Sequence, residues 1–152
     1  MLQLRNLALP MRRVAFVLLV LIAAGCGGGS RLSKTDYAKR ADAICSKYNA
    51  KINALGRPGG IKALPSYVDR ALPIARKGND ELRGLKAPKS EEKTAKEWVD
   101  QNDAVVAAME RLRDAAKGGD RSGIQVALTE AGTANRAANR FARRLGVRVC
   151  AR

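Results

Sequence analysis

The chain contains no histidine among its 152 residues. This absence excludes the imidazole base of serine and cysteine hydrolases, and it also excludes histidine ligands for a metal. Aromatic residues make up only 4% of the chain, and alanine is the most frequent of its hydrophobic residues. No set of side chains combines a nucleophile, a base and a group that orients the base. We therefore expect no enzymatic activity, no metal and no cofactor.

Acidic residues are half as frequent as basic ones, with 14 Asp and Glu against 29 Lys and Arg, so the formal net charge is +15. Cysteine is also scarce, since the chain has only three. The first of them, Cys26, follows an N-terminal segment with a distinctive pattern. Arg12 and Arg13 precede eleven apolar or small residues, 14–24. This pattern predicts a secretory signal peptide over residues 1–25.

The position of Cys26 at the predicted cleavage point resembles a bacterial lipobox. The cysteine of a lipobox receives a diacylglycerol, is acylated with chains such as palmitate, and becomes the first residue of the mature protein. Ordinary secretion, with cleavage behind residues 23–25, is the alternative interpretation. A membrane-spanning helix needs about 20 apolar residues, and this segment is too short for one. Met1 and Met11 both fit as the start of translation.

Three regions follow from this pattern. Residues 1–25 form the signal peptide, residues 26–32 the lipid anchor and a glycine-rich linker, and residues 33–152 a single helical domain. Removal of residues 1–25 lowers the formal net charge from +15 to +12, because it removes three arginines and no acid. We expect the protein to be anchored by lipid at the extracytoplasmic face of the cell membrane.

Hydrophobic periodicity predicts four helices separated by glycine and proline. The first begins at Ser33, where Ser33 and Asp36 form a variant of the capping box, and the last begins at Asp120 and ends before Gly146. The third begins with Ser90 as its N-cap and ends at Lys117. Apolar residues recur at spacings of three and four, and the expected core of the first and last helices comprises Tyr37, Ala41, Ile44, Tyr48, Ile52, Leu55, Ile124, Ala127, Ala131, Ala134, Ala138, Phe141 and Leu145.

The second segment, residues 61–85, is the least regular. Its apolar spacing predicts a helix, but Pro73 lies in its middle and should kink or split it. Together the four segments predict an all-α fold, an up-down four-helix bundle.

Cys45 and Cys150 are the cysteines that remain once Cys26 is assigned to the anchor. In an oxidising compartment, an isolated pair is most simply a disulfide. In an up-down bundle the last helix ends beside the start of the first, and residues 147–150 are long enough to reach back to Cys45. The predicted bundle therefore carries a C-terminal tail that is disulfide-linked to the first helix.

Three short motifs support this interpretation: Ala41-Asp42 with Ile44-Cys45, Leu82-Arg83 with Leu85 and Pro88, and Leu145-Gly146-Val147 with Val149-Cys150. Together they resemble a group of small exported lipoproteins from high-GC Gram-positive bacteria. The resemblance covers most of the mature chain. It implies the helical fold and the Cys45–Cys150 bridge, but it implies no activity, because those proteins are largely uncharacterised.

Basic residues are concentrated on the first and last predicted helices. The candidate surface for an anionic partner consists of Lys39, Arg40, Lys47, Lys51, Arg136, Arg140, Arg143 and Arg144. Such a partner would be anionic lipid, an anionic wall polymer or an acidic protein, whereas the compartment argues against nucleic acid. The alternative is that these side chains are simply a solvated face whose stems cover apolar surface.

The function expected from these features is that of a membrane-anchored, non-enzymatic binding or structural module. A second function, from another class, is a carrier of a small apolar ligand in the core of the bundle. In that case Trp98, Met109 and Phe141 would line the ligand pocket. Otherwise they are the largest core residues of an alanine-rich bundle.

Overall fold

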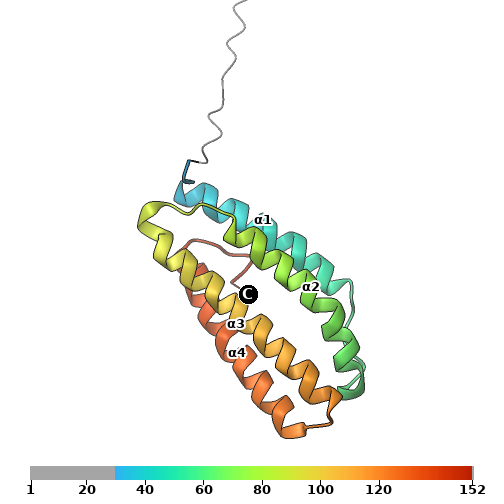
Figure 1. Cartoon of the computed structure of the whole chain (residues 1–152). Coiled ribbons are helices and arrows are strands. Elements are labelled where there is room, and N and C mark those ends of the chain that lie inside the picture. Colours follow the sequence, from blue (N-terminus) through green and yellow to red (C-terminus); the bar gives the residue numbers. More distant parts are fainter. Residues whose placement is uncertain (1–29, 152) are drawn as a thin grey trace, which may run out of the picture.

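The computed structural model describes residues 30–151. The predicted signal peptide, Cys26 and residues 27–29 of the linker lie outside the described residues, as does Arg152. Four antiparallel helices account for most of the described chain (Figure 1): α1 (Lys34–Asn53), α2 (Leu64–Arg83), α3 (Glu92–Lys117) and α4 (Arg121–Arg144). Short 3-10 turns, η1 (Ile61–Ala63) and η2 (Lys89–Glu91), precede α2 and α3. Residues 30–151 contain no strand, and the predicted all-α up-down bundle is confirmed.

The start of α1 has the cap that the sequence predicts. The Ser33 hydroxyl accepts a hydrogen bond from the backbone N–H of Asp36 at 3.1 Å and donates one to the Asp36 carboxylate at 2.6 Å. Behind this cap, Tyr37, Ala41 and Tyr48 are buried because their spacing places them on one face of the helix. The predicted core positions farther along α1 are only half-buried.

Pro73 does not split α2, which continues as one helix from Leu64 to Arg83. The side chain of Pro73 is exposed, on the face away from the buried Val68 and Leu72. A proline has no N–H for the carbonyl four residues earlier, and at this exposed position solvent can satisfy that carbonyl instead.

The prediction of Ser90 as the N-cap of the third helix is wrong. Ser90 lies within η2, the helix proper begins at Glu92, and no side chain caps its N-terminus. The predictions for α4 are confirmed at both ends. The Asp120 carboxylate accepts from the Gly123 N–H at 2.9 Å, and Gly146 reverses the chain with a φ of +79°.

The core consists of two clusters, one toward each end of the bundle. The end that holds the start of α1 and the end of α4 is called the tail end, and the opposite end the loop end. The core of the tail end contains the two largest of the fully buried side chains, Trp98 and Tyr37, with Leu145 and Val147. The core of the loop end is built by Val68, Leu72, Val106, Leu112, Ile124 and Ala127.

Candidate functional site

The C-terminal tail is the feature that organises the tail end. After Gly146 the chain runs back between the α1–α2 pair and the α3–α4 pair (Figure 1), and Val147 is completely buried. Cys150 forms a disulfide with Cys45 of α1, with the two Cα atoms 5.4 Å apart. The predicted link between tail and first helix is therefore present. It closes a loop across 105 positions of sequence.

Asp42 also holds this tail, through hydrogen bonds that the sequence analysis missed. Its carboxylate accepts from the backbone N–H of Arg148 at 2.9 Å and from that of Val149 at 2.7 Å. Both donors are backbone groups of the tail, and the bond to Val149 is partly buried. Only the folded tail brings these groups to Asp42, so no local sequence signal could have revealed the contact.

The eight basic residues of the predicted anionic-partner surface are all exposed. Lys47, Lys51 and Arg136 lie apart from the other five. Lys47 and Lys51 lie at the border between α1 and α2, where their ammonium groups approach the ring of Tyr48 at 5.0 and 5.1 Å. Arg136 lies farther along the outer side of α4 and donates to the Thr133 hydroxyl at 3.1 Å. The other five lie toward the tail end.

Lys47 belongs to a polar cluster rather than to an open cationic surface. Glu81 of α2 accepts hydrogen bonds from the Lys47 ammonium at 2.8 Å and from the Tyr48 hydroxyl at 2.6 Å. These two hydrogen bonds, that from Lys47 first, lower the pKa of Glu81, and the bonds to Glu81 raise the pKa of both Lys47 and Tyr48. The charge of Lys47 is therefore paired with an acid of the same chain, at the surface.

These five residues and Arg148 of the C-terminal tail form what we call the tail-end cations: Lys39, Arg40, Arg140, Arg143, Arg144 and Arg148. None of them forms an ion pair with a described acid. Arg144 lies over the Phe141 ring at 5.7 Å, and Arg143 donates to the carbonyl of Ala151 at 3.5 Å. The nearest acids in sequence on α1 are Asp36, which belongs to the helix cap, and Asp42, which receives the tail.

The distribution of ion pairs explains why these cations are left over. Eleven of the fourteen acids form ion pairs. The other three, Asp36, Asp42 and Asp120, accept from backbone N–H groups. Helix α3 carries six acids against five basic residues, whereas α4 carries one acid against five. Among the described residues, no ion pair joins α1 to α4.

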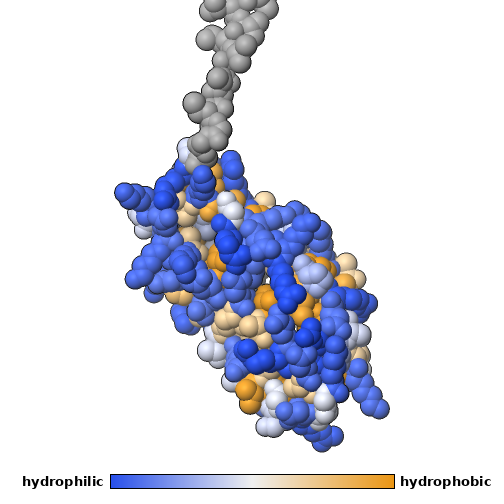
Figure 2. Space-filling view, in the orientation of Figure 1, coloured by the Kyte–Doolittle hydropathy of each residue, from blue (hydrophilic) through white to orange (hydrophobic). Residues whose placement is uncertain are grey.

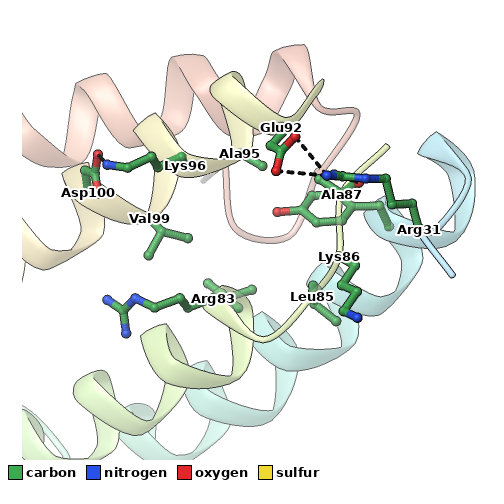
Figure 3. Close-up of a pocket in the computed structure, with 12 residues that line it drawn as sticks. Arg31, Arg83, Leu85, Lys86, Ala87, Glu92, Ala95, Lys96, Val99 and Asp100 are labelled. Atoms are coloured by element: carbon green, nitrogen blue, oxygen red, sulfur yellow. Dashed lines mark hydrogen bonds and ion pairs between the residues drawn. The ribbon is translucent and has the colours of Figure 1, made fainter. Parts of the chain in front are cut away.

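A pocket of about 620 Å³ opens where the end of α2, the start of α3 and the start of α1 meet (Figure 3). Leu82, Leu85, Ala87, Ala95 and Val99 give it an apolar wall. Figure 2 shows hydrophobic atoms exposed between α2 and α3 on a face that is otherwise largely hydrophilic. Its volume lies within the range of about 300–1,000 Å³ that is usual for small-molecule sites.

The rim of this pocket is charged. Arg31 donates to both carboxylate oxygens of Glu92 at 2.9 and 3.0 Å and to the Ala87 carbonyl at 3.1 Å, as Figure 3 shows for the ion pair. Lys96 pairs with Asp100 at 2.7 Å. Lys86 is the lining cation that no described acid neutralises.

Tyr37 lines the same pocket although it is only 1% exposed. Its hydroxyl has no hydrogen-bond partner among residues 30–151, and burial raises its pKa to about 12. No side-chain oxygen or nitrogen of these residues is both sealed from solvent and unpartnered. The small exposure of Tyr37 therefore lies at its hydroxyl, which meets the open space of the pocket. The sequence analysis placed Tyr37 in the core and gave no sign of this.

A second, smaller pocket of about 270 Å³ lies between the helices beside the Cys45–Cys150 disulfide and is open to solvent. Trp98 lines it, as do the amides of Asn49, Asn102 and Asn135. Phe141 and Met109, the other residues expected around a core ligand, do not line it. Phe141 packs against the core of the tail end, and Met109 packs against that of the loop end.

No family model matches this chain, and neither a curated protein nor a solved structure is significantly similar to it. Within residues 30–151, no helix has the length and apolar character needed to cross a membrane. The same residues contain no group of three or more acidic or cysteine side chains placed to hold a metal ion.

Proposed function

We propose that the protein is a lipid-anchored, extracytoplasmic binding module whose tail-end cations bind an anionic membrane surface. One observation carries this proposal. Six of the cations that form no ion pair with a described acid lie at the end of the bundle where the described chain begins, a few residues along the chain from the cysteine expected to carry the lipid. A non-enzymatic role is consistent with the absence of histidine from the sequence.

The linker strengthens this argument because part of it is docked on the bundle. The Leu32 N–H donates to the Lys86 carbonyl at 2.9 Å, and Arg31 pairs with Glu92. Only residues 27–30 then separate Cys26 from the docked segment, and four residues span at most about 13 Å. A lipid on Cys26 would hold the tail end within about two Debye lengths of the headgroups at physiological salt.

Anionic lipid is the partner that this placement favours over wall polymers or an acidic protein. Each Lys or Arg near an anionic bilayer contributes on the order of 1 kcal/mol. The acids of α3, including Glu92 at the docked linker, are held in ion pairs and so leave little free negative charge beside the anchor.

The second candidate function is that of a carrier for a small apolar ligand in the bundle core, and the pocket beside Trp98 is the observation in its favour. We rank it second because this pocket is smaller than the usual ligand sites, at about 270 Å³. Its three asparagine amides also make it a poor match for a wholly apolar molecule, since each would lose contact with water without gaining a partner.

The anchor is tested by mass spectrometry of the protein extracted from its native membrane. We expect a mature N-terminus at Cys26 that carries a diacylglycerol, and we expect Cys26→Ser to abolish both the lipid and the cleavage. Wild-type protein recovered in soluble form with an unmodified Cys26 thiol would contradict the anchor.

The cationic surface is tested by co-sedimentation of the expected mature chain, residues 26–152 with Cys26→Ser, with liposomes, with or without phosphatidylglycerol in phosphatidylcholine, across a salt series. We expect binding that needs the anionic lipid and weakens with salt. Replacing Arg140, Arg143 and Arg144 with Gln should reduce affinity about 100-fold, at about 1 kcal/mol for each charge.

The matched control removes the same charge at the loop end, as Arg57→Gln, Lys62→Gln and Arg121→Gln. All three side chains are exposed. We expect this variant to bind anionic liposomes within about threefold of the parent chain. An equal loss in both variants would show that only net charge matters, and binding that ignores phosphatidylglycerol would end the proposal.

A further inference from the structure

The pocket between α2 and α3 contains a donor that the folded chain leaves unused. A tyrosine hydroxyl is normally hydrogen-bonded when its ring is buried, because removing it from water without a partner costs free energy. The Tyr37 ring is buried, whereas its hydroxyl faces the pocket and bonds to no described residue. Whatever occupies the pocket therefore determines whether this hydroxyl has a partner.

Water can enter this pocket, but it would leave the apolar wall formed by Leu82, Leu85, Ala95 and Val99 uncovered. A molecule with an apolar body and one oxygen acceptor satisfies both features. Its body would cover the apolar wall, and its oxygen would accept from Tyr37.

The charged side chains at the rim of the pocket indicate which charge that acceptor should carry. Glu92 and Asp100 are each held by a cation, and Arg83 is held by Asp80 and Asp103 at 2.6 Å each. No described acid forms an ion pair with Lys86, and its flexible side chain lets the ammonium group move toward an anion at the mouth of the pocket. Because its pKa is about 12, Tyr37 stays a neutral donor at every physiological pH.

We propose that this pocket binds a small amphipathic carboxylate, with its apolar body on Leu82 and Val99 and its carboxylate facing the Tyr37 hydroxyl and Lys86. This inference does not rest on the anchor or on the tail-end cations, because none of the pocket-lining groups belongs to that surface. It also differs from the carrier discussed above, whose ligand is wholly apolar and lies beside Trp98.

Three probes with the same ten-carbon chain test the charge preference: decanoate, 1-decanol and decyltrimethylammonium. Binding to the expected mature chain, residues 26–152 with Cys26→Ser, is measured by titration calorimetry. We expect decanoate to bind at least tenfold more tightly than decanol, and decyltrimethylammonium to bind most weakly. Equal affinities for the three probes would overturn the proposal.

Two variants assign the contacts. Tyr37→Phe keeps the ring and should weaken decanoate about tenfold, the usual effect of one hydrogen bond to a charged group. Its stability should not fall, because the lost hydroxyl has no protein partner. Lys86→Gln should remove most of the preference for decanoate over decanol. Lys89→Gln, an exposed neighbour outside the pocket with the same change in charge, should leave the affinity unchanged.

The site of binding is located by the amide NMR shifts that decanoate induces. Ala95 and Val99 line only the pocket proposed here, whereas Ala75 and Val105 line only the pocket beside Trp98. We expect the shifts at Ala95 and Val99. Shifts confined to Ala75 and Val105, or a Tyr37→Phe variant that binds decanoate as the parent does, would overturn the proposal.

Discussion

The two ends of the bundle are held together in different ways. The tail end joins all four helices and the C-terminal segment around Tyr37 and Trp98, and a disulfide ties the segment to α1. The loop end joins α2, α3 and α4 around aliphatic side chains, and α1 contributes no buried residue to it. Around the loop end, ion pairs such as Arg111–Glu130, at 2.8 Å, join neighbouring helices.

This difference follows from how the chain connects the helices. A turn of three residues, 118–120, joins α3 to α4, so their contact at the loop end is local and costs little loop entropy. At the tail end, α1 and α4 meet only after the whole domain has been traversed. A covalent bond is most useful where the contact is least local. The functional features that we propose, the free cations and the carboxylate pocket, lie at this same covalently closed end.

The largest expected effect on stability comes from removing the disulfide at the tail end. Replacing both Cys45 and Cys150 with Ser should lower the free energy of unfolding by about 2–5 kcal/mol, because the bond closes a loop of about a hundred residues. Urea denaturation measures the change. Treatment of the wild-type protein with dithiothreitol should give the same stability, and it should leave the variant unaffected.

Hydrogen exchange on the same variant tests whether the two ends are independent. We expect faster exchange at Ala95 and Trp98, in the core of the tail end, and little change at Leu112 and Ala127 in that of the loop end. Equal acceleration at both ends would show that the bundle opens as one unit, and the comparison of the two ends would then not hold.

Much of the fold could be predicted from the sequence because its signals are local. The caps at Ser33 and Asp120, the terminal Gly146 and the three-four spacing of apolar residues are each contained within a few turns of chain. The Cys45–Cys150 bridge could be predicted because two cysteines leave one pairing. Local sequence patterns did not predict the course of α2 at Pro73 or the start of α3. Pro73 is accommodated because it faces solvent, and the start of α3 uses a 3-10 turn rather than the side chain of Ser90.

The candidate sites could be predicted only in part. Basic residues are visible in a sequence, but their partners are not, so the predicted surface included Lys47, which Glu81 neutralises, and omitted Arg148. The unused hydroxyl of Tyr37 could not be predicted, because the α1 periodicity correctly places its ring in the core. The free donor arises from the packing of three helices around it.

The smallest expected effect concerns Asp42, which fastens the tail without a covalent bond. Asp42→Asn removes the charge from an acceptor that takes hydrogen bonds from two backbone N–H groups, at 2.7 and 2.9 Å. Hydrogen bonds to a charged group are worth about 1.5–3 kcal/mol, so we expect a loss of about that size in urea denaturation.

The matched control at the loop end is Glu130→Gln, which also removes one acidic charge. Its ion pair with Arg111 is exposed, so the control should lose less than about 1 kcal/mol. Equal losses would mean that surface charge, rather than the fastening of the tail, sets the stability of both ends.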